Sequence, residues 1–501
     1  MKTTLLLSLL IALPASAKTV VPPVETFKLP NGLTVMLRED HSVPLVSVSF
    51  RGRAGSGLDP AGKEGLAFLT AETLLYGTAT LTEQQIDETT ERLGADVGST
   101  AGIEGFYVHG SVPTIDAGAM EQLLRIVADV LQHPSFPTEG VEKVRARVLG
   151  TLQGLVDDRA ELASRAFAAK VFAGHLYGRP TSGTLASLAA ITRDDMVEFH
   201  ASAVVPDEAA LGLAGDFEPK KLKPFLKMLF GDPKWGQVCP PGGKCYRACT
   251  RPKGESRCEA FRTPKGGEIQ NALLRIPSAP DQKGTRIVLV DTGDASLNQA
   301  QIRLGAPIGR IFANPGWHAH LLATQILGGD FTARLNARLR VKEGLTYGAR
   351  YGVDYDDIRS GAGIVSTYTS PKDVVRALRI TREELARFEK EPIPEDEMKR
   401  VATRIVRGFV FRFETAGATL SEHLDLWQDQ LPLTHLTTYT DKLAAVTPAD
   451  LAKVMGEFPL DDVTIVVVAN AALQADLEAL AKELGGTFET MTPKDLGLEA
   501  K

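Results

Sequence analysis

Apolar positions along the chain fall into two patterns, short continuous runs and longer stretches with helical spacing. Short runs typical of buried strands cover residues 26–37, 45–51, 209–213, 286–291, 299–304 and 463–468. Residues 141–155 and 398–411 place apolar side chains on one face of a helix, and each stretch follows a helix-breaking segment with two prolines. Strands mixed with grouped helices predict an α+β fold of the sandwich type.

The order of these elements repeats in the second half of the chain. Residues 188–195 read Leu-Ala-Ala-Ile-Thr-Arg-Asp-Asp, and residues 443–450 read Leu-Ala-Ala-Val-Thr-Pro-Ala-Asp. In both copies a threonine is placed to cap a helix, and an aspartate three residues later faces the amides of the first turn. We therefore expect two tandem copies of one unit, residues 25–231 and residues 268–490.

Charge and the N-terminal residues narrow the class of protein. The 501 residues carry a formal net charge of -6 at pH 7, which argues against a nucleic-acid binder with a basic face. Lys2, a short apolar run and the small residues 15–17 are typical of a secretory signal peptide, so we expect cleavage after residue 17. An uncleaved apolar anchor is the alternative for residues 1–17. No later apolar run is long enough to span a membrane.

The four cysteines, Cys239, Cys245, Cys249 and Cys258, lie close together in a segment rich in proline, glycine and lysine. We expect this segment, residues 232–267, to link the two units. In an exported chain such a cluster favours two disulfides, although four cysteines allow three pairings. A zinc knot held by all four thiolates is the alternative, but the spacing lacks the close C-x2-C pairs of such sites.

Residues 65–78 resemble the zinc-site helix of the M16 peptidases, the family of insulin-degrading enzyme, pitrilysin and the mitochondrial processing peptidase. That family carries H-x-x-E-H between Gly-Leu-Ala and Leu-x-x-Gly-Thr, and both flanks are present here. The resemblance places Phe68 and Glu72 at the two histidine positions and Ala71 at the catalytic glutamate. Thr151 or a neighbour takes the position of the third ligand. Because a catalytic zinc needs about three protein ligands and a nearby base, we expect neither metal nor hydrolysis here.

The nine histidines offer no substitute metal site in the sequence. Only His318 and His320 are close together, and a spacing of two does not place them on one helix face. We expect them at the surface or at the start of a helix.

The second unit retains another part of the family's pattern. It contains a glycine loop, then F-T-A-R-L and L-R-V-K-E-G-L-T-Y, which resemble the family's second-half sequence. The resemblance matches Arg340 and Tyr347 to the arginine and tyrosine that reach the zinc-bearing domain in catalytic members. Such a tyrosine can donate to an oxyanion, and an arginine fork can hold a carbonyl or carboxylate. Gly328, Gly329 and Phe331 are the candidates for contact with an extended peptide.

A structural role for the pair is the alternative, in which Arg340 ends a helix and Tyr347 is half-buried in a strand. The resemblance runs from about residue 25 to residue 484. It implies two tandem duplicated α/β-sandwich domains of the M16 (LuxS/MPP-like) type, which form one bowl-shaped half of a clam-shell.

For function, the resemblance implies the metal-free subunit of an exported heterodimer. A zinc-bearing M16 homologue would cleave small peptides, while Arg340 and Tyr347 act in trans on its site. This chain would bind no cofactor, the zinc would belong to the partner, and the complex would lie in the periplasm or outside the cell. The alternatives are a pseudopeptidase that binds peptides or acts as a scaffold, and a free-standing metallopeptidase with ligands that the sequence does not reveal.

Overall fold

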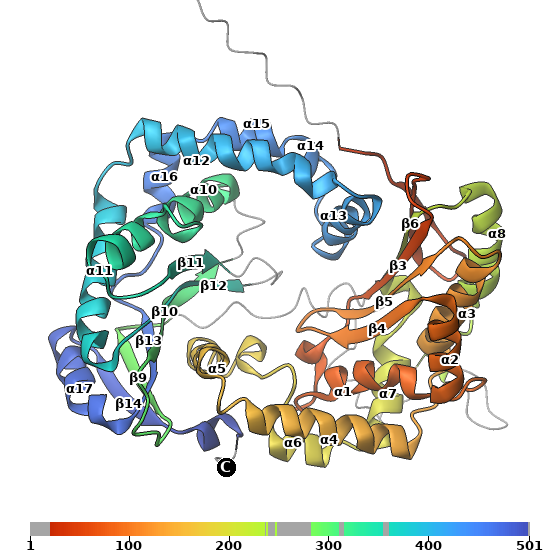
Figure 1. The fold of residues 1–501 in the computed structure, drawn as a ribbon, viewed down its shortest axis with the longest axis horizontal. Coiled ribbons are helices and arrows are strands. Elements are labelled where there is room, and N and C mark those ends of the chain that lie inside the picture. Colours follow the sequence, from red (N-terminus) through yellow and green to blue (C-terminus); the bar gives the residue numbers. More distant parts are fainter. Residues whose placement is uncertain are drawn as a thin grey trace, which may run out of the picture.

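The computed structural model describes residues 21–235, 237–238, 246–247, 282–309, 315–353 and 360–498. The predicted signal peptide, residues 1–17, and all four cysteines lie outside these residues. The predictions of export and of disulfides therefore stay predictions. Two halves of the chain, each with its own sheet, follow one another along the sequence (Figure 1).

The elements of the first half are β1 (Glu25–Lys28), β2 (Thr34–Glu39), β3 (Leu45–Gly52), α1 (Leu66–Thr73), α2 (Glu83–Leu93), β4 (Asp96–Ala101), β5 (Phe106–Pro113), α3 (Ala119–Gln132), α4 (Thr138–Gly154), α5 (Arg159–Val171), α6 (Leu185–Ala190), α7 (Arg193–Ala203), β6 (Ala209–Gly215) and α8 (Pro219–Phe230). A short pair follows, β7 (Gln237–Val238) and β8 (Tyr246–Arg247).

The elements of the second half are β9 (Arg286–Asp291), β10 (Ala300–Gly309), α10 (Trp317–Gly328), a π-helix (Asn336–Lys342), β11 (Ala349–Val353), β12 (Ser360–Thr369), α11 (Val374–Lys390), α12 (Glu395–Gly408), α13 (Ala416–Gln428), α14 (Thr434–Thr437), α15 (Tyr439–Ala444), α16 (Pro448–Met455), β13 (Thr464–Ala469), α17 (Gln474–Glu483) and β14 (Thr487–Met491).

The two six-stranded sheets share one topology. Their strand orders are β4-β5-β3-β6-β2-β1 and β11-β12-β10-β13-β9-β14. In both sheets the first four strands pair antiparallel and the fifth pairs parallel to the fourth. Only the sixth strand differs, because β1 pairs antiparallel with β2 whereas β14 pairs parallel with β9. The duplicated α+β fold predicted from the sequence is thereby confirmed.

The predicted helix caps are present in both copies. The Thr192 hydroxyl accepts the Asp195 amide at 3.2 Å, and the Asp195 carboxylate accepts the Thr192 amide at 2.8 Å. Thr447 and Asp450 make the same reciprocal bonds, at 3.2 and 2.9 Å. Each cap satisfies amides that the first helical turn leaves without partners.

One strand prediction is wrong in detail. The apolar run 26–37 forms two strands, β1 and β2, which pair with each other across a turn. Gly32 has φ +96°, and a Cβ at this position would lie 2.8 Å from the Cβ of Asp207. A glycine is required there by both the backbone conformation and the close packing, and this turn divides the run.

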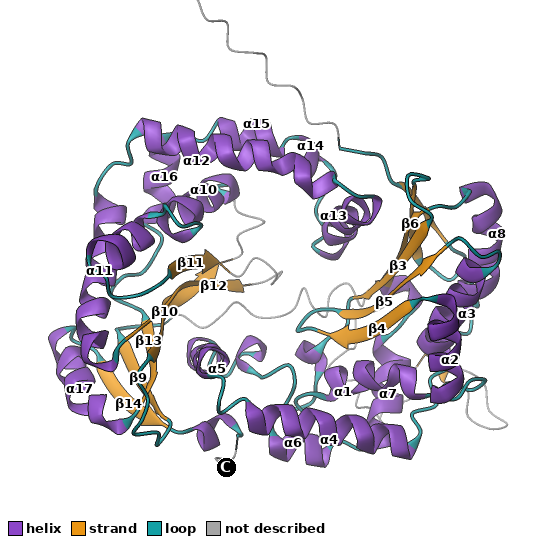
Figure 2. Cartoon of the chain, in the orientation of Figure 1, coloured by secondary structure: helices purple, strands orange, loops and turns teal. Residues whose placement is uncertain are grey.

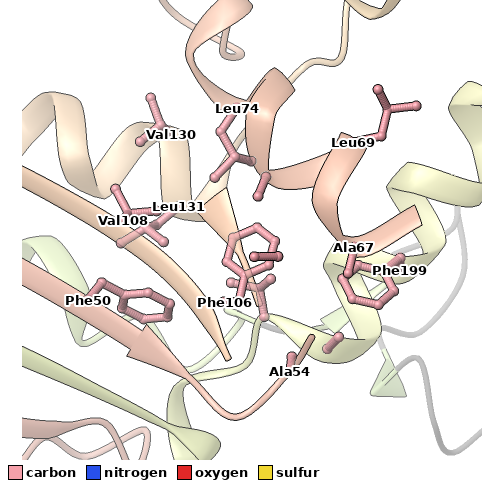
Figure 3. Close-up of a cluster of buried hydrophobic side chains, with 14 of the residues drawn as sticks. Phe50, Ala54, Ala67, Leu69, Leu74, Phe106, Val108, Val130, Leu131 and Phe199 are labelled. Carbon is pink, nitrogen blue, oxygen red and sulfur yellow. The ribbon is translucent and has the colours of Figure 1, made fainter. Parts of the chain in front are cut away.

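Helices of its own half cover part of each sheet. Figure 3 shows part of the first core, where Phe50 of β3 and Phe106 of β5 are wholly buried. Leu74, which follows α1, and Leu131 of α3 are buried in the same cluster. This face of the sheet therefore forms one apolar core with α1 and α3.

The helix α5 packs on β10 and β13 of the second sheet, although it belongs to the first half (Figure 2). Phe167 of α5 is 2% exposed and reaches Gly305 of β10, where a Cβ would lie 2.9 Å from its ring. Arg303 of β10 donates to the Ala160 carbonyl at 2.8 Å. The first half therefore supplies part of the cover of the second sheet.

Conversely, the helix α13 of the second half packs on β2 and β6 of the first sheet (Figure 1). Leu420 and Leu424 of α13 are buried against Met36, Ala210 and Ala214 of these strands. The two halves are thus joined by apolar faces as well as by the chain between them.

Candidate functional site

The helix α1 carries the positions expected to have lost a metal site, and it packs on α4. Phe68 is half-buried and Ala71 is wholly buried. The Glu72 Oε2 lies 2.8 Å from Nη2 of Arg147, a residue of α4, and this hydrogen bond raises the pKa of the arginine. The Thr151 hydroxyl, one turn further along α4, donates to the Arg147 carbonyl at 3.1 Å.

These side chains do not fit a zinc ion. Glu72 is the only carboxylate among the four candidate positions, and a cation already binds it. Phe68 and Ala71 offer no metal ligand. The sequence analysis did not identify Arg147 as the partner of Glu72, although a spacing of four from Thr151 places both residues on one face of α4. Across the ranges that the structure describes, no group of three or more histidine, cysteine or acidic side chains could hold a metal ion.

His318 and His320 lie in the first turn of α10, so the expectation of a helix start is confirmed. Both side chains are buried, and neither is at the surface. His320 Nε2 lies 3.1 Å from Glu457 Oε2. Burial lowers the pKa of His318 to about 4, and its ring packs near Tyr439. The expectation of surface histidines is wrong because α10 packs against α15 and α16, which cover its first turn.

The second-half candidates gather around one hollow of about 770 Å³. It is lined by the end of α10, the π-helix and the strands β11 and β12. The Arg340 guanidinium lies over the Phe331 ring, 4.2 Å from its centre, a distance typical of cation–π contact. Tyr347 precedes β11 and is 79% exposed, so it is not half-buried in a strand.

Gly328 and Gly329 also line this hollow. A Cβ on Gly328 would lie 2.0 Å from the backbone nitrogen of Tyr351 in β11. A Cβ on Gly329 would lie 2.4 Å from the side chain of Gln325. Gly328 therefore lets β11 lie directly against the end of α10, and Gly329 leaves room for the side chain of Gln325, so both glycines have a reason in the protein's own packing.

Arg340 and Arg350, which both line this hollow, have no hydrogen-bond or ion-pair partner among the described residues, whereas other arginines nearby do. Arg334 forms an ion pair with Glu397 at 2.7 Å, and Arg338 binds Glu343. Within the described part of the chain, neither the Arg340 guanidinium nor the Tyr347 hydroxyl makes a hydrogen bond or ion pair. The five donors of the guanidinium and the phenol are thus available to a ligand.

The strand β11 lies at the edge of its sheet, and the hollow runs along it. One side of β11 pairs with β12. The other side has no strand partner in the described ranges, so it can accept the backbone of an added peptide. A peptide at this edge would pass Arg340 and Tyr347.

Two protein-family models match the chain. The model described as insulinase (peptidase family M16) matches residues 34–185, and the model described as peptidase M16 inactive domain matches residues 190–405. The non-peptidase homolog YmxG of Helicobacter pylori is 22% identical over 475 residues, which are 93% of this chain and 98% of YmxG. An uncharacterised zinc protease of Mycobacterium leprae is 24% identical, over 78% of this chain and 80% of the relative.

Solved structures with the same fold include other M16 proteins. The peptidase M16 inactive domain protein of Pseudomonas fluorescens has a TM-score of 0.74 at 20% identity, covering 89% of this chain and 98% of that one. The periplasmic protease PqqL of Escherichia coli has a TM-score of 0.70 at 16% identity, covering 94% of this chain and 50% of PqqL. At these identities the likeness establishes a shared fold. In the described residues no helix has the length and apolarity that a membrane crossing requires.

Proposed function

The chain belongs to the M16 family of insulinase-like peptidases, and we propose that it is the metal-free subunit of a two-chain zinc peptidase. In this proposal a zinc-bearing M16 homologue supplies the metal and the general base. Both subunits enclose peptides, and this chain supplies Arg340 and Tyr347 to the shared site.

The observation that carries the proposal is a contrast between the two halves. On α1 the Glu72–Arg147 pair uses the one remaining candidate carboxylate. In the second half Arg340 and Tyr347 stand beside an open strand edge with their polar atoms unbonded within the described residues. Unbonded donors at an exposed edge suit a ligand or partner better than they suit stabilisation of the fold.

The chemistry of the pair follows from its geometry. An extended peptide added to β11 would present its backbone carbonyls beside Arg340, whose fork can hold one of them. The Tyr347 hydroxyl, exposed at the start of the strand, would donate to the oxygen that gains charge during hydrolysis. The partner's zinc would polarise that carbonyl and activate a water. The contact of Arg340 with Phe331 would keep the guanidinium at this edge.

Export is part of the same proposal. Its support is the signal-like N-terminus in the sequence and the fold shared with PqqL, which is a periplasmic protease. A periplasmic location would let the complex act on exported or imported peptides.

The test is co-expression with a zinc-bearing M16 homologue of the same organism, followed by purification and assay on a mixture of short peptides. Tyr347→Phe removes one hydroxyl, and Arg340→Ala removes the guanidinium. Loss of an oxyanion donor lowers kcat about 10²- to 10³-fold, so we expect a loss of this size for Tyr347→Phe. Arg379→Ala is the control, because this exposed arginine pairs with Glu483 on the outer surface.

Unchanged cleavage in both variants, with the complex intact, would refute the supply of catalytic groups. That outcome would favour the second candidate function, a pseudopeptidase that binds peptides or holds an assembly together. The relative described as a non-peptidase homolog favours this second candidate.

A further inference from the structure

A second hollow, of about 920 Å³, lies where the two halves meet. The first half lines it with α5 and with Tyr177 to Thr184, and the second half lines it with β10, β12 and the turn at residues 494–497. Phe68, the residue at the first histidine position of the family motif, forms part of its wall. This hollow is distinct from the one that contains Arg340.

The lining of this hollow carries an excess of positive charge. Its cationic side chains are those of Arg165, Arg179, Arg303 and Lys494, and its carboxylates are those of Glu161 and Asp495. The Asp495 carboxylate is already used, because it accepts the amide and the hydroxyl of Thr492 at 2.7 and 2.9 Å. Glu161 is exposed.

The three arginines bind neutral groups only. Arg165 donates to the carbonyls of Gly183 at 2.6 Å and Leu496 at 3.3 Å. Arg179 donates to the Asp59 backbone carbonyl at 3.1 Å. Arg303 donates to the Ser164 hydroxyl at 3.3 Å and to two backbone carbonyls. None of the three has an ion pair with a carboxylate anywhere in the described ranges.

Unpaired cations in such a place are energetically unfavourable. Burial lowers the pKa of Arg165 to about 10 and also lowers that of Arg303, which is 9% exposed. A cation that is taken out of water is stabilised when an anion lies against it. The unused donors of Arg165 and Arg303 therefore suit a negatively charged ligand.

We propose that this hollow anchors a peptide by a carboxylate, either its C-terminal carboxylate or an acidic side chain. Arginine forks match the planar carboxylate with two parallel hydrogen bonds. The side chains of Phe68, Phe167 and Phe172 supply apolar walls for the neighbouring part of the peptide. The inference rests on the proposed function only in taking the ligand to be a peptide.

The two hollows adjoin along β12. Ile364 and Ser366, alternate residues that point to one face of this strand, line both of them. A peptide held by a carboxylate beside Arg303 would therefore extend past these residues toward β11. The anchor would set which part of the peptide reaches Arg340 and Tyr347.

The test uses the isolated full-length chain, so it does not depend on a partner or on cleavage. The probes are three N-terminally fluorescein-labelled decapeptides of one neutral sequence. The first ends in a free carboxylate, the second in an amide, and the third in an amide with one internal glutamate. Fluorescence anisotropy measures binding at low and high salt, and inorganic phosphate serves as a competitor.

We expect the free acid to bind at least tenfold tighter than the amide, with a preference that weakens as salt rises. Tight binding of the glutamate peptide as well would show that any carboxylate serves, and its failure to bind would assign the site to the C-terminus. Competition by phosphate at millimolar concentration would agree with an anion site. Equal binding of the acid and both amides would overturn the proposal.

Arg165→Gln and Arg179→Gln should each reduce the preference for the acid about tenfold and leave binding of the amide unchanged. Arg379→Gln is the matched control, since it removes the same charge from the outer surface. Thermal unfolding verifies that each variant is folded, and if Arg165→Gln is not, Arg179→Gln decides. Retention of the full preference in a folded Arg179→Gln and in Arg165→Gln would also contradict the proposal.

This outcome is separable from that of the proposed function. If the free acid binds more tightly than the amide while Tyr347→Phe leaves cleavage unchanged, only the catalytic role of Tyr347 is refuted. If cleavage depends on Tyr347 while the acid and the amide bind equally, only the carboxylate site is refuted.

Discussion

The exchange of α5 and α13 between the halves predicts where a core mutation in α13 will act. Leu424 is wholly buried, yet it belongs to the second half and contacts the first sheet. Replacing it with alanine should therefore loosen β2 and β6, which precede it in the chain by more than two hundred residues. The same change in a helix that covers its own sheet should not.

The size of the effect follows from what lies opposite. Loss of a buried leucine to alanine costs about 2–5 kcal/mol, depending on how well the site can collapse. Leu424 faces Gly212 of β6, where even a Cβ would lie 2.9 Å from Leu424 Cδ1, so this position of β6 offers no side chain that could move into the space. Leu420 of α13 is buried in the same cluster, and Trp427 of this helix packs against it. We therefore expect a cost of about 4 kcal/mol, toward the upper end of the range.

The assay combines guanidinium unfolding with hydrogen exchange followed by mass spectrometry. Leu424→Ala should lower the free energy of unfolding and speed exchange of the amides in β2 and β6. Leu378→Ala is the matched control, because Leu378 of α11 is 1% exposed within the second half's own core. It should cost a similar free energy without faster exchange in β2 and β6. If hydrogen exchange in Leu424→Ala became faster only in the second half, the packing of α13 on the first sheet would not stabilise that sheet, and the prediction would be refuted.

Three further predictions concern single groups. Burial raises the pKa of Asp59 to about 7 from 3.8, so the protonated carboxyl contributes its full free energy of stabilisation below about pH 4, and this contribution is lost as the pH rises through 7. Urea unfolding at pH 5 and at pH 8 measures the loss, and in Asp59→Asn the free energy of unfolding should depend less on pH. Burial lowers the pKa of His200 to about 4 from 6.5, so stability should fall as the pH drops from 6.5 to 4, and acid unfolding of His200→Gln should lack that loss. Glu72→Ala breaks a pair with a half-exposed arginine, so it should cost less than about 1 kcal/mol in thermal unfolding and leave zinc content by mass spectrometry unchanged, and a fall in zinc would contradict the account of α1.

Features that depend on neighbours in the sequence could be predicted well. The caps at Thr192 and Thr447 need only an aspartate three residues later, and both formed as expected. The strand β9 was predicted with its observed limits, because an apolar run of this length with β-branched residues is typical of a buried strand. The turn at Gly32 was missed because its reason, the side chain of Asp207, lies far along the chain.

Features that depend on distant packing could not be predicted. The apolar faces of α5 and α13 show that each helix covers a sheet, but not which sheet. The burial of His318 likewise depends on α15, a helix more than one hundred residues later. Motif resemblance located Arg340 and Tyr347, whereas the cluster of Arg165, Arg179 and Arg303 matches no motif because its members come from both halves.

The exchanged helices bear on the ancestry of such a chain. A polypeptide with only one of the two units would leave a sheet without its α5- or α13-type cover and would carry a helix with no sheet beneath it. Two copies of that short polypeptide could complete each other by the same reciprocal contact, which is the self-complementary arrangement of a two-fold symmetric dimer. Fusion of two such genes would then have changed the connectivity of the ancestor without changing its packing.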